Sequence, residues 1–249
     1  MTFDPDRYAP KSISDIVFPT DHARVVLHDI ISNDLPFPLS GKNGILLYGT
    51  WGTGKTALAN LLPDALELAR SGQPAQSRFL PIQQGNNGAA VITSIMAQTQ
   101  AVPYSGSYHY FVLDEVDNLK GPAMTSLKTV MARPGTIFIM TTNVLADVDR
   151  GVQNRCHCIE FNAAPAQAWL PSVKTVITDL GGQIPPDAVL LPVITACRGS
   201  ARDIITAAAA VANRQKRILL QQVGGCQVPV SAPTVVARSN QSKISAATP

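Results

Sequence analysis

Charged and aromatic residues are scarce in this chain of 249 residues, at 15% and 6% of the sequence. Its 20 Lys and Arg against 17 Asp and Glu give a formal net charge of only +3. So small an excess does not indicate a nucleic-acid or membrane surface by itself, and any such partner needs a local patch. The hydrophobic content of 45% excludes a disordered or collagen-like chain and allows a sizeable buried core.

Long apolar runs and a secretory leader are also missing. No run approaches the roughly 18 apolar residues that a membrane-spanning helix needs, and the start of the chain has neither the basic nor the apolar part of a signal peptide. The four cysteines are too few for a disulfide framework, and Cys156-His157-Cys158 has no second ligand pair at zinc spacing. These absences predict a cytoplasmic protein with free thiols and no membrane partner, with a zinc site as the open alternative.

Short apolar runs alternate with segments of helical length through the first two thirds of the chain. Strands are predicted over 44–48, 78–82, 108–114, 136–141 and 158–161, and helices over 21–32, 55–70, 90–98, 121–132 and 144–153. The strands are mostly apolar, as expected where helices cover both faces of a sheet. The pattern predicts an α/β fold with a parallel five-stranded sheet.

The pattern changes to helices only after residue 163, with candidates over 166–180, 186–196 and 200–222. The segment 223–249 contains no aromatic and no acidic residue, a composition that cannot offset the entropy of ordering. We therefore expect an α/β nucleotide-binding domain over 1–163, a small helical lid domain over 164–222 and a flexible tail over 223–249.

The first chemical motif follows the first predicted strand. Residues 49–56 read GTWGTGKT, which fits the phosphate-binding pattern GxxxxGK[ST] between a strand and a helix. Backbone N–H groups of such a loop bind phosphate, while Lys55 reaches the β and γ phosphates and the Thr56 hydroxyl ligates Mg²⁺. A glycine-rich turn that binds nothing is the alternative. The predicted ATP-binding residues here are Gly49, Gly52, Thr53, Gly54, Lys55, Thr56 and Ala57.

A second motif supplies the acids that such a loop needs. The apolar run before residue 114 ends in Asp114 and Glu115. Asp114 is predicted to hold the metal with Thr56, and Glu115 to polarise the attacking water, which distinguishes an ATPase from a passive nucleotide binder. An acidic N-cap of the next helix is the alternative. The strand predicted at 78–82 lies between the two motifs in sequence, which favours P-loop ATPases with an extra strand between the two motif strands.

With these motifs the chain resembles AAA+ ATPases, and among them the motor subunits of sliding-clamp loaders. Residues 7–17, RYAPKSISDIV, are similar to that family's tyrosine-arginine-proline box and the step that follows it. The resemblance implies that Tyr8, Val17 and Phe18 surround the adenine. Ala9 stands where the family usually has Arg.

Three further motifs extend the resemblance, which covers about residues 7–220. The sequence TTN at 141–143 resembles sensor 1, which implies that Asn143 positions the hydrolytic water. The sequence NRC at 154–156 resembles the Ser-Arg-Cys box, which implies that Arg155 is an arginine finger. The sequence GSARD at 199–203 resembles sensor 2, which implies that Arg202 lies near the γ-phosphate. Each has a plain alternative: an Asn-initiated turn, a solvated Arg at a helix end, and a pair between Arg202 and Asp203.

Two departures from the family bear on partners. Clamp-loader subunits have a C-terminal collar, whereas only the predicted tail follows residue 222, so the resemblance implies oligomers held by the ATPase domains or by another protein. Family members also contact DNA after the second and third strands, yet residues 79–113 contain no charged side chain. Lys120, Lys128 and Arg133 are the basic residues nearest that region. Gln83 occupies the position of the family's residue that couples DNA contact to the catalytic Glu.

The sequence therefore predicts an ATP-hydrolysing motor of the clamp-loader type, acting in DNA replication or repair on DNA and a protein client such as a sliding clamp. The alternative is an ATP-dependent scaffold on DNA that resembles helicase loaders and transposition regulators. A regulatory subunit with a degenerate cycle is a third possibility, against which the intact Lys55, Asp114 and Glu115 argue.

Overall fold

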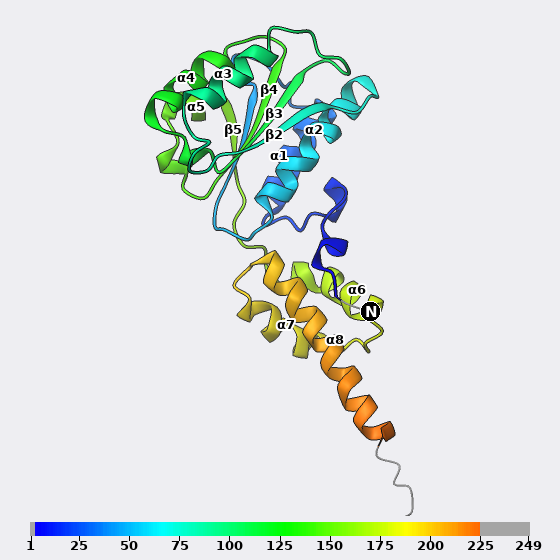
Figure 1. Ribbon diagram of the computed structural model, residues 1–249. Helices are drawn as coiled ribbons and strands as arrows, with labels where there is room; N and C mark the ends of the chain where they lie inside the picture. The colour runs from blue at the N-terminus through cyan, green and yellow to red at the C-terminus, as the bar shows by residue number, and fades with distance from the viewer. Residues whose placement is uncertain (1–2, 225–249) are drawn as a thin grey trace, which may run out of the picture.

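Five parallel strands form the centre of the larger part of the molecule (Figure 1). The structure is a computed structural model, which describes residues 3–224, with side chains up to 218. The strands are β1 (Gly44–Tyr48), β2 (Gln76–Pro81), β3 (His109–Asp114), β4 (Thr136–Thr142) and β5 (Cys156–Glu160). Their order is β2-β3-β4-β1-β5, so β4 separates the strands that carry the two motifs. This confirms the predicted α/β fold with its five-stranded parallel sheet.

Helices cover both faces of the sheet because each strand alternates its side chains. On β1, Ile45 and Leu47 pack toward one face with α1 (Asp21–Ser32) and α2 (Lys55–Ser71). Leu46 packs toward the other, with α3 (Ala89–Gln98), α4 (Gly121–Met131) and α5 (Arg150–Gln153). Apolar side chains on both faces explain why the strands read as continuous apolar runs.

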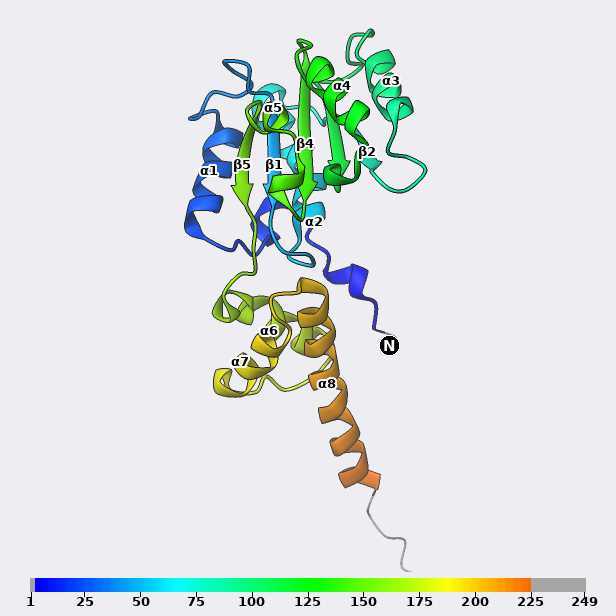
Figure 2. The ribbon, with the colours of Figure 1, turned by 90° about the vertical axis from the view of Figure 1, so that its left-hand side faces the viewer.

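A second body of helices lies beyond the carboxyl ends of the strands (Figure 2). It consists of α6 (Leu170–Asp179), α7 (Asp187–Ala196) and α8 (Ala201–Gly224), which enclose their own buried cluster around Trp169 and Val176. Tyr8 near the start of the chain packs against the same cluster. The last strand ends at Glu160 and only helices follow, but where domains divide stays a prediction.

Short 3₁₀ helices complete the described part: Pro5–Tyr8, Ile13–Asp15, Val116–Asn118, Leu145–Asp147 and Ala166–Trp169. Two of them break helices predicted as continuous. The helix predicted over 144–153 divides because Asp149 accepts a hydrogen bond from Gly151 N (2.6 Å) and caps a new helix. The helix predicted over 166–180 starts as a 3₁₀ turn, with Pro171 in the first turn of α6.

The end of the chain also differs from expectation. Helix α8 continues to Gly224, two residues beyond its predicted end at 222. The rest of the predicted tail, 225–249, lies outside the described residues. Within the described part, no helix combines the length and the apolarity needed to cross a bilayer.

Candidate nucleotide site

The glycine-rich loop joins the carboxyl end of β1 to the first turn of α2. Gly54 is the N-cap of α2 with φ +100°, and Gly49 has φ +145°. A Cβ on Gly49 would lie 2.6 Å from Asn162 Oδ1, the atom that accepts a hydrogen bond from Thr50 N (3.0 Å). The loop therefore needs glycine both for its dihedrals and for its close approach to the segment after β5.

Lys55 is 94% buried, since its relative exposure is 6%, and it points back over the loop. Its Nζ donates to the carbonyl oxygens of Gly49 (2.9 Å) and Thr50 (2.6 Å). Burial lowers the pKa of Lys55, while nearby carboxylates, Asp114 foremost, act to raise it. Carbonyl oxygens carry no full charge, so a phosphate at the loop would be a stronger partner for this ammonium.

The rest of the loop is fixed by the chain around it. The hydroxyl of buried Thr53 lies within hydrogen-bonding distance of the carbonyl oxygens of Thr50 (3.0 Å) and Phe161 (2.8 Å). Ala57 lies half-buried in the first turn of α2. The N-terminus of α2 thus presents its unpaired N–H groups at a rigid loop, an arrangement suited to an anion.

The two acids lie beside this loop at the carboxyl edge of the sheet. The Thr56 hydroxyl donates to Asp114 Oδ1 (2.7 Å), and the Thr141 hydroxyl donates to the same oxygen (2.7 Å). Because the Thr56 hydroxyl donates its proton to Asp114, the lone pairs of its oxygen are directed elsewhere and can bind a cation. Hydroxyl and carboxylate oxygens are ligands that Mg²⁺ prefers, so these residues fit the metal that the motif predicts.

Glu115 follows Asp114 in an uncommon backbone conformation. It is exposed, with φ 57° and ψ 53°, the left-handed region that non-glycine residues rarely adopt. Asn118 Nδ2 lies 3.2 Å from Glu115 Oε2 and 3.1 Å from the carbonyl of Ile82 at the end of β2. The predicted catalytic carboxylate is therefore hydrogen-bonded by Asn118, and the coupling role of Gln83 stays a prediction.

The residues expected around the adenine line one cleft of about 820 Å³. Tyr8 and Val17 pack against the helical cluster, whereas Phe18 packs against the sheet, with its ring edge-on to Phe161 at 6.0 Å. Ile205 of α8 completes the cleft. The three residues are thus brought together where the helices meet the sheet body.

Two predicted polar residues also lie at this edge. Asn143 follows β4 directly and is half-buried. Arg202 lies exposed in the first turn of α8, whose start rests on the phosphate loop through a hydrogen bond from Ala201 N to Gly52 O (2.8 Å). Among the ion pairs of the described side chains, none joins Arg202 to Asp203.

Arg155 lies at the opposite end of the sheet. Its carbonyl accepts hydrogen bonds from Asn43 N (3.1 Å) and Gly44 N (3.0 Å), beside the amino end of β1. The phosphate loop begins five residues later, about 16 Å away at the usual rise of a strand. The side chain of Arg155 stays at this end, where its Nη1 donates to Gly151 O (2.7 Å). Arg155 is therefore separated from the site of its own chain.

Three site residues were not predicted from the sequence. Asn162 holds the loop, Asn118 contacts Glu115, and Thr141 contacts both acids. Thr141 had a detectable signal, since it lies two residues before Asn143 and strand alternation places both on one face. The other two are polar residues just beyond a strand, in positions that carry no motif.

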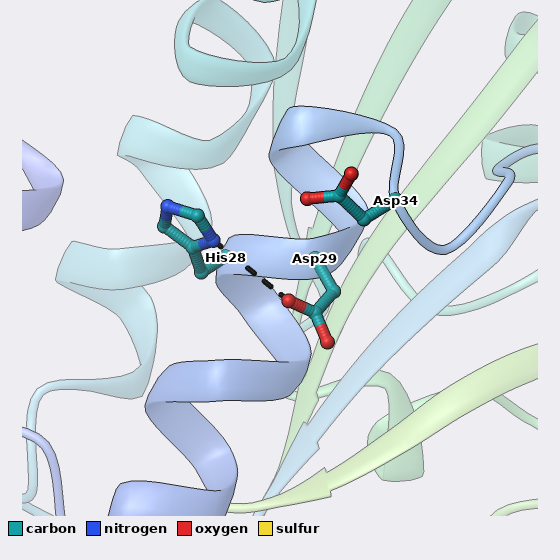
Figure 3. A group of neighbouring side chains, drawn as sticks. All are labelled: His28, Asp29 and Asp34. Atoms are coloured by element: carbon teal, nitrogen blue, oxygen red, sulfur yellow. Dashed lines mark ion pairs between the residues drawn. The ribbon is translucent and has the colours of Figure 1, made fainter.

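A separate cluster of possible metal ligands lies at the end of α1 (Figure 3). His28 Nδ1 is 3.8 Å from Asp29 Oδ1, and Asp34 accepts a hydrogen bond from the Ser32 hydroxyl (2.6 Å). His28 and Asp34 are exposed. The cluster shares no residue with the nucleotide site and reads as a surface ion pair.

Comparison with known protein families identifies the segment of the chain that carries this site. Residues 45–163 match the model of AAA, the ATPase family associated with various cellular activities. The chain contains an AAA ATPase domain. That domain spans β1 to the segment after β5, and it includes the glycine-rich loop and both acids. The match of this segment to the family implies nucleotide binding.

The relatives of known name are subunits of replication factor C. The small subunit 2 from Pyrobaculum islandicum is 26% identical over 219 residues, which are 86% of this chain and 64% of the relative. The large subunit from Methanosarcina mazei is 24% identical over 230 residues, 88% of this chain and 35% of the relative. The chain thus resembles clamp-loader subunits but spans less than two thirds of either one.

Solved structures share the fold of the AAA domain and its helical neighbour. The RuvB Holliday junction branch migration motor of Thermotoga maritima aligns with a TM-score of 0.61 at 17% identity, over 87% of this chain and 67% of that one. PCH-2 of C. elegans aligns with a TM-score of 0.57 at 14% identity, over 81% and 71%. At such identities the likeness concerns the fold alone.

Proposed function

We propose that this chain is an ATP-hydrolysing motor of the clamp-loader type that acts in DNA replication or repair. The observation that carries the proposal is the meeting of Lys55, Thr56 and Asp114 at one edge of the sheet, with Glu115 beside them. The replication factor C relatives supply the clamp-loader part of the proposal.

ATP binds with its phosphates at the N-terminus of α2 and its adenine in the cleft of Tyr8, Val17 and Phe18. Lys55 exchanges its carbonyl partners for oxygens of the β and γ phosphates. Thr56 and Asp114 would hold Mg²⁺, which would neutralise charge that develops on the phosphate oxygens. These contacts orient the triphosphate for in-line attack by water.

Hydrolysis uses the polar groups around the γ-phosphate. Glu115 accepts a proton from the attacking water, and Asn143 orients that water from the end of β4. Arg202, which has no ion pair with Asp203, stabilises the γ-phosphate from α8. Arg155 serves a neighbouring copy, because it is separated from its own loop by the length of β1.

That last role requires an oligomer assembled through the ATPase domains. In support, Arg155 lines a cleft of about 610 Å³ together with Lys42 and Arg133, and no carboxylate residue lines it. A basic cleft at one end of the sheet is complementary in charge to the phosphates of ATP bound at the other end of a neighbouring copy, which favours head-to-tail assembly when ATP is bound. We also propose that 1–163 and 164–222 are separate domains, because the helical part has a hydrophobic cluster of its own.

DNA and a sliding clamp are the proposed partners. The replication factor C relatives support DNA as a partner. A protein client is supported by the loop after α3, where Val102 and Tyr104 are 88% and 98% exposed. The loop is held in place, since Tyr104 N donates to Gln76 Oε1 (2.8 Å). Lys128 already pairs with Asp149 (3.1 Å), which leaves Lys120 and Arg133 as the better candidates for DNA contact.

The site is tested by ATP titration calorimetry on two variants. Lys55→Ala removes the ammonium and should lose ATP binding, whereas Glu115→Gln should bind ATP but fail to hydrolyse it. Lys216→Ala, on an exposed part of α8, is the matched lysine control. Equal ATP affinity in wild type and Lys55→Ala would contradict the site. Turnover stimulated by a clamp and DNA supports the motor; ATP-dependent filaments with negligible turnover would favour the scaffold instead.

A further inference from the structure

Thr141 is the buried residue that joins the two acids of the site. It is 2% exposed at the end of β4. Its hydroxyl donates to Asp114 Oδ1 (2.7 Å) and accepts from Glu115 N (2.9 Å). We propose that Thr141 is a positioning residue for ATP hydrolysis, which fixes the Asp114 carboxylate and the Glu115 backbone relative to each other. This inference rests on the proposed function.

Glu115 needs such support because of its backbone. The left-handed conformation at φ 57° is unfavourable for a residue with a Cβ, so contacts on both sides must maintain it. Thr141 holds the N–H of Glu115, and the carbonyl of Glu115 accepts from Asn118 N (3.0 Å). Without the hydroxyl, this peptide loses a buried partner and the conformation that directs the carboxylate loses one of its two restraints.

Asp114 depends on the same hydroxyl in a different way. Its Oδ1 receives two donors, Thr141 from β4 and Thr56 from α2, both at 2.7 Å. The two bonds fix the rotation of the carboxylate and so the direction of its other oxygen. Three separate elements are thereby held together around a single carboxylate oxygen, at the place where the metal would bind.

The side chain of Thr141 is buried and bonded to the two acids, so it is not exposed for contact with ATP. Its hydroxyl proton is donated to Asp114, and one of its lone pairs accepts from Glu115 N. It therefore acts through the acids. This separates Thr141 from Asn143, which lies two residues later at the edge of the sheet and is more exposed.

The test compares Thr141→Val, which keeps the shape but removes the hydroxyl, with Thr141→Ser, which keeps the hydroxyl. Thr136→Val is the matched control, because Thr136 is also 2% exposed on β4 but bonds to Arg133 O (2.8 Å) at the amino end. Losing a buried partner of the acids should lower kcat of Thr141→Val by about 10- to 100-fold. Its Kd for ATP in calorimetry should change by less than about threefold, since Lys55 and the loop remain intact.

The other readouts separate positioning from packing. Thr141→Ser should restore kcat to within about threefold of wild type, and Thr136→Val should keep wild-type kcat. The Mg²⁺ concentration for half-maximal turnover should rise in Thr141→Val. A Thr141→Val protein with wild-type kcat, or a Thr141→Ser protein as slow as Thr141→Val, would overturn the inference.

Two controls keep the outcome decisive. If Thr141→Val does not fold, as judged by its circular dichroism, Thr141→Ala replaces it, and wild-type kcat in that variant overturns the inference equally. If wild type itself shows no ATP binding that Lys55→Ala removes, the proposed function has failed. If wild type hydrolyses ATP and only the Thr141 result is negative, the inference alone has failed.

Discussion

Both ends of the central sheet bury charged groups, but they satisfy them differently. At the amino end, Glu67 is fully buried and accepts hydrogen bonds from Tyr110 (2.8 Å) and Ser107 N (2.7 Å). At the carboxyl end, the ammonium of Lys55 has only two carbonyl oxygens. The first charge is stabilised by hydrogen bonds from the chain itself, whereas the second forms no ion pair with any described residue. Buried charge therefore serves stability at one end and ligand binding at the other.

The backbone shows the same division. Glu115 at the carboxyl end has a left-handed conformation although it is not glycine, and its side chain is exposed. At the amino end the left-handed position next to the buried network is a glycine, Gly106, with φ +78°. Strain is thus tolerated at Glu115, where catalysis is proposed, whereas at Gly106, beside a structural contact, glycine avoids it.

The largest effect on stability is expected from Glu67→Ala. The change leaves the hydroxyl of Tyr110 and the N–H of Ser107 without their acceptor and opens a cavity, which should lower the free energy of unfolding by about 3 kcal/mol. Urea unfolding measures the loss, with Glu67→Gln as the control that preserves shape and one acceptor. Turnover per folded molecule should stay at the wild-type value, and a selective loss of turnover would break the division between the two ends.

A smaller effect is expected from Gly106→Ala. A Cβ there would lie 2.7 Å from Glu67 Cδ, in addition to the cost of a positive φ. Gly85→Ala is the matched control, since Gly85 has φ +91° but nothing within 4 Å of its Cβ position. We expect losses of about 2 kcal/mol for Gly106→Ala and about 1 kcal/mol for Gly85→Ala. Equal losses in thermal unfolding would show that the contact with Glu67 adds nothing.

The smallest effect concerns pH. Burial by itself raises the pKa of Glu67, but hydrogen bonds from its neighbours, including Tyr110 and Ser107, more than offset this and lower the pKa below 4.5. A carboxyl with a lowered pKa in the folded state stabilises it above the unfolded pKa, and this contribution disappears as pH falls through the folded pKa. The stability advantage of wild type over Glu67→Gln should therefore shrink between about pH 6 and pH 3. An advantage that stays constant over this range would contradict the lowered pKa.

The sequence was informative wherever a feature is local. All five strands were predicted to within two residues at either end, because apolar runs buried on both faces stand out between turn residues. The glycine-rich loop and Asp114 were predicted to lie at one edge of the sheet, because phosphate binding requires these residue types at a fixed spacing. The structure brings Thr56 and Asp114 into contact there. The break at Asp149 was missed, since a cap inside a helical pattern resembles an ordinary polar residue of a helix.

Contacts between distant residues were not predictable in this way. Thr141 is 26 residues from Glu115, and Glu67 is 43 residues from Tyr110. Which threonine meets which acid depends on the order of strands, which the sequence patterns leave open. The contact between Glu115 and Asn118, which lies in the 3₁₀ turn after β3, was likewise not predicted from the sequence.

Arg155 is the exception to the division between the two ends, and it gives the most direct test of the account. It lies at the amino end, yet we propose that it acts in catalysis at the carboxyl end of another copy.

An arginine finger is worth on the order of 10³ or more in rate, so Arg155→Ala should bind ATP normally but hydrolyse it slowly. The measurement is ATP turnover after mixing Arg155→Ala with Lys55→Ala protein, each of which should show little turnover alone. The account predicts that the mixture regains turnover, because a site with intact Lys55 then receives Arg155 from its neighbour. No recovery in mixtures that native mass spectrometry shows to co-assemble, or wild-type turnover in Arg155→Ala alone, would contradict it.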